Sequence, residues 1–247
     1  MSEIRRSRMS EPAAKPPADW LRVLGRQWWH LQGLKAVGIF GFMPLFFAAY
    51  FHVLHHPVNS VTTMPLTPLD EWISFQPWAF WIYVSLWLYV GISPALQPTL
   101  RALLQYGAWA TALCLTGLLC FYLWPTAVPS QAHHLDPAVA DHAGFALLRG
   151  VDTAGNACPS LHVATAVFTA WWLNRLLAAV RAPAWPHALN MAWVLAIAWS
   201  TVAVRQHVVL DVVAGALLGT AFAVLSLRFG PTPGTARAGL PLSLTRL

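Results

Sequence analysis

Three ionisable side chains stand where apolar stretches begin, and their types suit phosphoryl transfer. His207 and Asp211 are four residues apart at the start of the apolar run 208–227, so they share one face if this run is helical. A carboxylate within a membrane-spanning helix is costly and is usually functional. His162 stands at the start of another apolar stretch, directly after Cys158-Pro159-Ser160-Leu161. Two histidines and one carboxylate at helix entrances indicate chemistry at a membrane surface.

Phosphoryl transfer through a histidine needs a nucleophile, a proton donor and cations, and the sequence offers a candidate for each. A neutral histidine attacks phosphorus well when a carboxylate holds its other ring N–H, which His207 and Asp211 could achieve. His162 could then donate a proton to the departing oxygen. Cations must neutralise the transferred group, and Arg205 and Arg149 are the candidates.

Ser160 fits as the N-cap of the helix that His162 opens, and its hydroxyl could also contact a phosphate oxygen. The first backbone N–H groups of a helix favour an anion, so both histidines stand where a phosphate would be attracted. Gly215 and Gly219 are four residues apart on the last apolar stretch. Such a pair of small residues would let two helices approach closely, which is the condition for the two histidines to meet.

Each of these residues also has a purely structural interpretation. His207 and Asp211 could be a pair that only fixes helix packing. His162 could be an interfacial histidine with satisfied hydrogen bonds and no reaction to perform. Arg205 could set the membrane topology or touch a headgroup, and Arg149 lies in a long connecting segment. The functional interpretation therefore depends on the whole constellation rather than on any one side chain.

The composition is that of an integral membrane protein. The chain of 247 residues is 57% hydrophobic and 10% charged, well outside the average for soluble domains. A membrane-spanning helix needs about 20 apolar residues, and stretches of that length recur. We expect an all-α integral membrane protein, a bundle of six transmembrane helices. These are predicted at residues 34–54, 78–97, 103–124, 161–181, 187–204 and 207–227.

The basic residues lie almost entirely on one side of these predicted spans. Thirteen of the fifteen Lys and Arg residues stand before or at the start of the first span, after the last span, in the second connection, or near the end of the fourth span; only Arg149 and Arg205 lie on the other side. Basic residues favour the cytoplasmic side, so both termini should be cytoplasmic. Both histidines should then face outward, toward the periplasm of what we expect to be a bacterial inner membrane. Topology thus explains the net charge of +6, and no nucleic-acid partner is expected.

The chain divides into one catalytic domain and two tails. Residues 1–33 and 228–247 are predicted to be flexible cytoplasmic tails around a six-helix catalytic domain at 34–227. The outward connection 125–160 is too long for a simple loop. Within it, Asp141 could begin and Gly150 could end a short interfacial helix beside a lipid substrate.

These motifs resemble those of a known family. Pro159-Ser160-Leu161-His162, followed by Ser200, His207 and Asp211, resembles the second and third signature motifs of the type 2 phosphatidic acid phosphatase superfamily. Those motifs read P-S-x-H and S-R-x-x-x-x-x-H-x-x-x-D. The branch that looks most similar contains the inositol phosphorylceramide synthases, which are inositolphosphotransferases. The residues that carry this finer likeness are Leu161, Gln206-His207…Asp211-Val-Val-Ala-Gly215, Asp70…Pro77…Trp81-Ile-Tyr83 and Trp124-Pro125-Thr126…Pro129.

The resemblance covers roughly residues 65–225 and implies a role for each site residue. His207 would form a phosphohistidine intermediate, Asp211 would orient it, and His162 would protonate the leaving group. Ser160 would help to bind the phosphate. Two features depart from the family pattern: Thr201 replaces the arginine of the third motif, and no segment clearly matches the first motif, K-x-x-x-x-x-x-R-P. Arg205 could compensate from a different position.

A competing motif indicates a different class of enzyme. His52-Val-Leu-His55-His56 matches the H-x-x-H-H box of membrane di-iron desaturases. Two irons need several such boxes, and His133-His134 is the only further doublet. The box also falls on the outward side, opposite to the side on which desaturase boxes lie. We interpret these residues as interfacial histidines.

The sequence therefore predicts an enzyme that acts on lipid phosphates at the outer membrane face and needs no metal or other cofactor. Water as the acceptor would make it a phosphatase, and an alcohol would make it a phosphotransferase; both reactions use the same intermediate. The alternatives are a non-catalytic membrane scaffold or transporter with a degenerate site, and a di-iron desaturase. The lipid substrate and the oligomeric state are not determined by the sequence.

Overall fold

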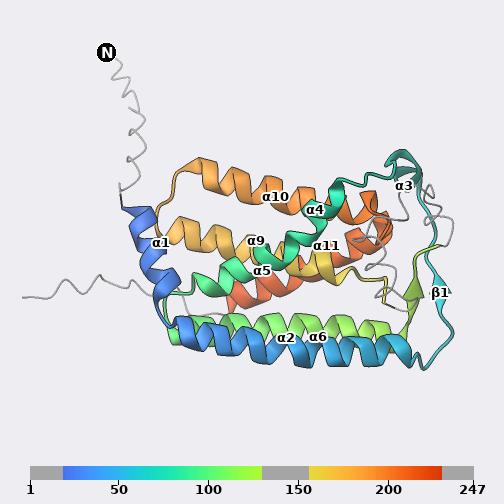
Figure 1. Cartoon of the computed structure of the whole chain (residues 1–247), viewed down its shortest axis with the longest axis horizontal. Coiled ribbons are helices and arrows are strands. Elements are labelled where there is room, and N and C mark those ends of the chain that lie inside the picture. The colour runs from blue at the N-terminus through green and yellow to red at the C-terminus, as the bar shows by residue number, and fades with distance from the viewer. Residues whose placement is uncertain (1–18, 130–155, 230–247) are drawn as a thin grey trace, which may run out of the picture.

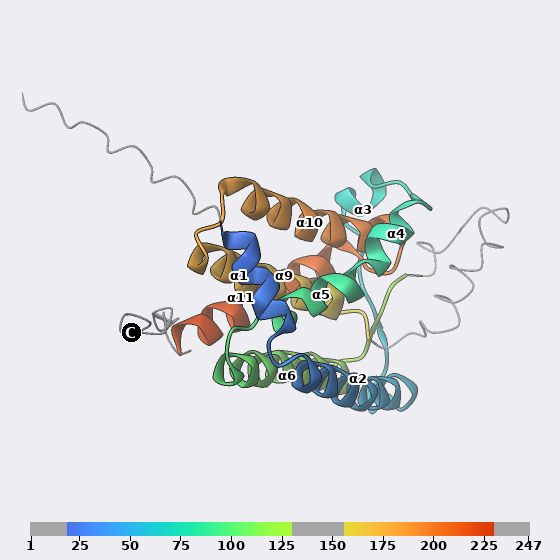
Figure 2. The same cartoon turned by 60° about the vertical axis from the view of Figure 1, so that its left-hand side comes forward.

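A computed structural model describes residues 19–129 and 156–229 of the chain. It is mostly helical, and its long helices run side by side as one elongated bundle (Figures 1 and 2). The helices are α1 (Trp20–Trp29), α2 (Gln32–His55), α3 (Pro68–Trp72), α4 (Ala79–Val84), α5 (Leu86–Ala95), α6 (Leu100–Leu123), α9 (Leu161–Ala179), α10 (Ala184–Ala203) and α11 (Val209–Arg228). Two short strands, β1 (Thr62–Thr63) and β2 (Thr126–Ala127), pair in parallel at one end.

All six apolar stretches predicted from the sequence are helical. By length and composition, α2, α6 and α11 could cross a membrane, with mean hydropathies of 1.8, 1.5 and 2.0. Large apolar side chains on these helices are exposed, among them Phe40 at 77%, Leu45 at 73% and Leu217 at 67%. An apolar surface of this extent is typical of contact with a partner or with lipid. Six membrane crossings remain a prediction.

The predicted span at 78–97 is two consecutive helices rather than one. The single residue Ser85 separates α4 from α5. The Ser85 hydroxyl donates to the Ile82 carbonyl at 2.6 Å, and a serine that bonds back to its own helix competes with the regular backbone ladder. Helix α4 contacts α10. This places the side chains of α4 against the end of the bundle where the histidines lie.

Helix α9 lies at the centre of the bundle. It contacts α5, α6, α10 and α11, and eleven of its 19 residues are buried. Polar groups in the interior of the bundle need hydrogen-bond partners. Asn190 of α10, at the interface with α9, donates to the Ala170 carbonyl at 2.9 Å and accepts from the Tyr89 hydroxyl at 2.6 Å. The central position of α9 fixes the residues at its start, including His162.

The structure differs from the sequence prediction in three further places. The tail predicted for residues 1–33 contains α1, whose Trp20 and Leu24 pack against the core. Helix α10 begins at Ala184 rather than residue 187, because Pro186 falls in its first turn, where a missing N–H is tolerated. The strand pair β1–β2 joins the segments after α2 and after α6 in a fold expected to be all-α. The predicted interfacial helix from Asp141 to Gly150 lies outside the described residues.

Candidate functional site

His162 is held by the start of α9. Ser160 is the N-cap of this helix, and its Oγ accepts a hydrogen bond from the Val163 N–H at 3.3 Å. A serine at this position satisfies one of the unpaired donors of the first helical turn, so the predicted capping role is confirmed. His162 follows two residues later, and its side chain is partly buried. The cap therefore fixes where the α9 backbone presents this histidine.

His207 is held by the turn between α10 and α11. The backbone N–H groups of Gln206 and His207 both donate to the Thr201 carbonyl, at 3.0 and 3.1 Å, and that of Arg205 donates to the Val202 carbonyl. This is the Schellman pattern that ends many helices, and it needs a residue in the left-handed region. Arg205 fills that position with φ of 62°, where glycine would be usual. The two apolar stretches predicted at 187–204 and 207–227 are thus joined by a tight turn that contains no glycine or proline.

Two glycines let α11 lie directly against α9. A Cβ atom on Gly215 would overlap the Ser160 carbonyl oxygen, and one on Gly219 would overlap the Ala164 carbonyl oxygen. The Ser160 N–H also donates to the Asp211 carbonyl at 3.0 Å. The close approach predicted from the Gly215/Gly219 pair is therefore present. It brings the starts of α9 and α11 together, and with them the two histidines.

The two imidazoles and the carboxylate form a continuous chain. The Nε2 atom of His207 lies 3.4 Å from Nδ1 of His162, and the Nδ1 atom of His207 lies 3.5 Å from Oδ2 of Asp211. His207 is 7% exposed and Asp211 is fully buried. The Nδ1 contact is longer than a good hydrogen bond, and Nδ1 has no hydrogen-bond partner among the described residues. Such contacts are often loose in a site without substrate.

Asp211 also has a second partner. Its Oδ2 atom accepts from the Val208 N–H at 3.0 Å, which satisfies a donor ahead of the first turn of α11. The carboxylate is therefore fixed by the backbone while it faces His207. This arrangement lets one side chain both cap a helix and orient an imidazole.

Tyr83 of α4 contacts the other side of His162, and sequence reasoning assigned it no role. Its hydroxyl lies 2.8 Å from Nε2 of His162, and the two ring centroids are 4.8 Å apart. Trp87 of α5 meets the same imidazole edge-on at 6.1 Å. Both ring nitrogens of His162 thus have a partner, the Tyr83 hydroxyl on one side and His207 on the other. In the sequence, Tyr83 stood out only as part of the segment Asp70…Pro77…Trp81-Ile-Tyr83, which resembles the inositolphosphotransferase branch.

Asp70 of α3 is a second residue that the sequence left without a function. It is 2% exposed, and its Oδ1 atom accepts from the Val209 N–H at 2.7 Å. Its Oδ2 atom accepts from the Thr67 N–H and hydroxyl, both at 2.7 Å. The spacing Thr67-x-x-Asp70 is the signal that could have identified this cap. Because Asp70 and Asp211 already take N–H groups at the start of α11, that helix start is less available to a phosphate than we expected.

The predicted phosphate-binding residues have different positions. Ser160 is fully buried beside Asp211. Arg205 is partly buried, and its Nη1 atom donates to the Asp70 carbonyl at 2.9 Å, which ties the α10–α11 turn to α3. One such bond leaves other guanidinium N–H donors for an anion. Arg149 lies outside the described residues.

Thr201, which stands where the third motif has arginine, has a structural role. It is fully buried, and its hydroxyl donates to the Ala198 carbonyl at 2.8 Å. Its carbonyl closes the turn by accepting from Gln206 and His207. The side chain at this position therefore serves the helix and brings no cation to the histidines.

The H-x-x-H-H histidines do not form a metal site in the structure. Within residues 19–129 and 156–229, no three His, Cys, Asp or Glu side chains are grouped so that they could hold a metal ion. Nδ1 of His55 faces the Phe51 carbonyl at 2.7 Å and Nδ1 of His56 faces the His52 carbonyl at 2.9 Å. These exposed side chains bond to their own helix, which agrees with the interfacial interpretation.

Comparison with known proteins gives one match. A family model described as the PAP2 superfamily matches residues 102–234, a range that contains His162, His207, Asp211, Ser160 and both candidate arginines. No curated protein and no solved structure matches the chain.

Proposed function

Because this chain belongs to the PAP2 superfamily, whose members are generally phosphatases or phosphotransferases, we propose that it is a membrane enzyme that acts on lipid phosphates. The observation that carries the proposal is the chain of contacts from His162 through His207 to Asp211. A nucleophile backed by a carboxylate, with a second imidazole beside it, is the set that covalent phosphoryl transfer needs.

We assign His207 as the nucleophile. Its Nε2 atom attacks phosphorus, an N–P bond forms, and the P–O bond to the leaving alcohol breaks. His162 gives a proton to that departing oxygen. In the second half, His162 takes a proton from water or from an acceptor alcohol, whose oxygen attacks phosphorus and breaks the N–P bond. Asp211 holds the Nδ1 side of His207 and stabilises the imidazolium, as in other carboxylate–histidine pairs.

The two imidazoles lie closer together than an in-line reaction between them requires. A nucleophile approaches phosphorus to about 3–3.5 Å before reaction, and a proton donor stands about 2.6–3.2 Å from the leaving oxygen. If the nucleophile and the proton donor lie in line on opposite sides of the phosphorus, their nitrogen atoms must be roughly 6 Å or more apart. In the structure, Nε2 of His207 and Nδ1 of His162 are 3.4 Å apart. Substrate entry must therefore move His162 away from His207. Tyr83 is the partner that could hold His162 in either position.

The cations that bind the transferred phosphoryl group would come from the turn between α10 and α11 and from the connection 125–160. Arg205 stands two residues before His207 and Arg149 eleven residues before Ser160, and we propose both as phosphate ligands beside Ser160. A planar guanidinium suits paired phosphate oxygens. Arg205 would reach the phosphate with the donors not used on the Asp70 carbonyl.

The membrane orientation that we propose is supported by the uneven distribution of basic residues between the two ends of the bundle. The basic residues Arg22, Arg26, Lys35, Arg101, Arg175, Arg181 and Arg228 belong to the end where α1 lies, whereas α3, β1 and the starts of α9 and α11 form the other end (Figure 1). By the positive-inside rule, we propose six crossings, cytoplasmic termini and an active site at the periplasmic face of a bacterial inner membrane.

The branch that resembles inositolphosphotransferases remains our proposal for the finer relationship. Its support is that Asp70 and Tyr83, from the segment that carries the likeness, contact the start of α11 and His162. Whether water or an alcohol accepts the phosphoryl group is an experimental question, because both would use the same histidine.

The deciding experiment measures released phosphate and new lipid product side by side, with purified full-length protein and a panel of lipid phosphates. We expect turnover in the wild type and none in His207→Ala. Radiolabelled substrate should leave an alkali-stable, acid-labile label on wild-type protein and none on His207→Ala. His55→Ala, an exposed histidine at the same end, is the matched control and should react normally.

The non-catalytic alternative, a scaffold or transporter with a degenerate site, predicts no vanadate-sensitive turnover on any lipid phosphate. The desaturase alternative predicts iron-dependent oxidation of an acyl chain. Wild-type rates in both His207→Ala and His162→Ala would refute the roles that we assign.

A further inference from the structure

Helix α1 runs across one end of the bundle rather than along it (Figures 1 and 2). The turn into α2 passes through Leu31, whose φ is 57°, and such a left-handed residue redirects the chain sharply. Lys35 then fixes the angle. Its buried Nζ atom donates to the Gln27 carbonyl at 2.7 Å and to the Ala95 carbonyl at 2.6 Å, which joins α1, α2 and α5. In a bundle that crosses a bilayer, a helix fixed in this way lies in the plane of the interface.

The inner face of α1 is docked on the bundle. Trp20 and Leu24, four residues apart, pack against the core cluster around Leu176 and Leu177. Trp20 also meets Trp185 of α10 edge to face, with ring centroids 5.9 Å apart. The packing and the lysine bonds mean that α1 presents one defined outer face.

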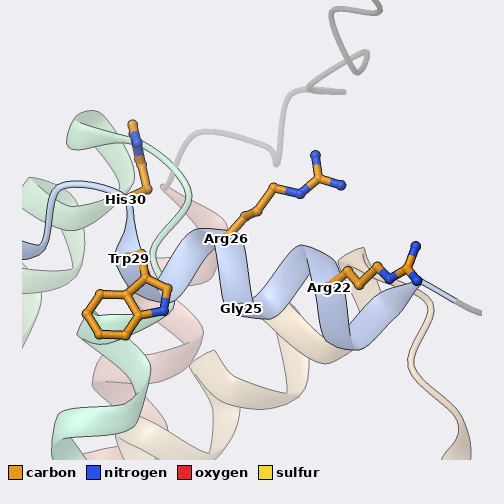
Figure 3. Close-up of a pocket in the computed structure, with 5 residues that line it drawn as sticks. All are labelled: Arg22, Gly25, Arg26, Trp29 and His30. Carbon is orange, nitrogen blue, oxygen red and sulfur yellow. The ribbon is translucent and has the colours of Figure 1, made fainter.

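That outer face joins apolar and cationic side chains. Leu21 is 62% exposed and Trp29 is 74% exposed, although neither packs against the core. Beside them, Arg22 and Arg26 are four residues apart and so line one side of the helix, and His30 follows as its C-cap. Figure 3 shows Arg22, Arg26 and His30 directed away from the bundle, around the open hollow that they line with Gly25 and Trp29.

We propose that this outer face of α1, formed by Leu21, Arg22, Arg26, Trp29 and His30, binds the headgroups of anionic phospholipids in the leaflet opposite the histidine site. Tryptophan is enriched where headgroups meet hydrocarbon, and an amphipathic helix rich in arginine and tryptophan binds that boundary through both buried area and charge. Two arginines and an adjacent histidine complement a negatively charged surface. The exposed Leu21 and Trp29 favour a bilayer over a soluble acidic partner.

A nearby carboxylate does not cancel this charge. Asp19 lies 3.4 Å from Arg22, but both side chains are largely exposed, and such ion pairs are weak. Arg26 has no acidic partner among the described residues. The surface therefore keeps a net positive charge. The proposal requires the bundle to stand in a membrane, but it does not require His207 to be catalytic.

The test uses purified full-length protein in detergent, titrated with phosphatidylglycerol, with phosphatidylcholine, or with inorganic phosphate, while native mass spectrometry follows the tightest lipid site. We expect phosphatidylglycerol to bind at least tenfold more tightly than phosphatidylcholine, and inorganic phosphate not to compete. Replacing both arginines, Arg22→Gln with Arg26→Gln, should weaken phosphatidylglycerol binding by about thirtyfold. Arg101→Gln removes an exposed arginine at the same end from α6 and should bind as the wild type does.

A second variant guards against a folding defect. Arg22→Lys with Arg26→Lys keeps the charge, so it should bind phosphatidylglycerol within about threefold of the wild type. Equal binding of both phospholipids, or wild-type binding by the double glutamine variant, would overturn the proposal. So would displacement of the lipid by inorganic phosphate, which would mean a small-anion site. Loss of binding in the lysine variant would likewise show that charge at the surface is not the cause.

Discussion

The Nε2 atom of His207 lies 3.4 Å from the Nδ1 atom of His162, although 45 residues separate the two in the chain. This contact depends on features that surround the histidines. Gly215 and Gly219 let α11 lie directly against α9. The turn closed by the Thr201 carbonyl places His207 beside His162.

Asp211→Asn should separate the orienting role of this residue from its capping role. The amide oxygen can still accept from the Val208 N–H, now at 3.0 Å from Oδ2, so the start of α11 should survive. The negative charge beside Nδ1 of His207 is lost, and we expect kcat to fall about 10²–10⁴-fold. Steady-state kinetics and thermal unfolding on the same preparation check this. A kcat within threefold of the wild type would show that the carboxylate is only structural.

Tyr83→Phe should reduce turnover through His162. The variant keeps the aromatic contact at 4.8 Å but removes the hydroxyl that lies 2.8 Å from Nε2. Losing one hydrogen bond to a buried group is worth about 1–1.5 kcal/mol, so kcat should fall about tenfold with little change in KM. Tyr122→Phe, an exposed tyrosine of α6, is the control. A lower melting temperature with normal kcat would assign Tyr83 to packing alone.

Gly215→Ala should separate the two helices that carry the histidines. Its Cβ would overlap a backbone oxygen, Ser160 O, which cannot rotate away, so α9 and α11 must move apart. We expect the free energy of unfolding to fall by about 1–3 kcal/mol and turnover to fall further than stability explains. Gly107→Ala is the control, because nothing lies within 4 Å of its added Cβ. Normal activity in Gly215→Ala would mean that this contact does not position the histidines.

Arg205→Gly should distinguish a phosphate ligand from a turn residue. Glycine adopts the φ of 62° without strain, so the turn should remain. If the guanidinium binds the substrate phosphate, KM should rise about tenfold or more. Arg181→Gly tests the same exchange at the same kind of turn, with φ of 53°, at the far end of the bundle, and should leave KM unchanged. Equal KM values for Arg205→Gly and the wild type would limit Arg205 to its contact with Asp70.

Cys158 should react slowly with alkylating reagents. Burial, together with the nearby Asp211 carboxylate, raises the pKa of this thiol to about 11 from 9.0. The thiolate is the reactive form, so a raised pKa leaves about 100-fold less of it at pH 8 than an ordinary thiol has. Iodoacetamide labelling followed by peptide mass spectrometry should show a rate that still rises about tenfold per pH unit near pH 10. A plateau below pH 9 would contradict the raised pKa.

Much of the helical plan could be predicted from the sequence, because it depends on local physics. Apolar stretches of spanning length form helices wherever they occur, and Ser160 before an apolar run is a recognisable cap. The Gly215/Gly219 spacing predicted close packing for the same reason, since small residues leave room whatever the partner is. The identity of His162, His207 and Asp211 as candidates also came from local pattern, a costly charge within an apolar helix.

Only the tertiary structure decided what surrounds these residues. Tyr83 of α4 contacts His162 across 79 residues of the chain, and Asp70 contacts Val209 across 139 residues. The left-handed turn at Arg205 contains no glycine that would have predicted it. Helix α1 is fixed by Lys35 of α2, which donates to carbonyl groups of α1 and α5. Contacts of this kind depend on which helices pack together, which is set by the sum of many weak interactions across the chain. The spacing of residues along the sequence specifies which side chains share a helix face. It does not specify which other helix will pack against that face.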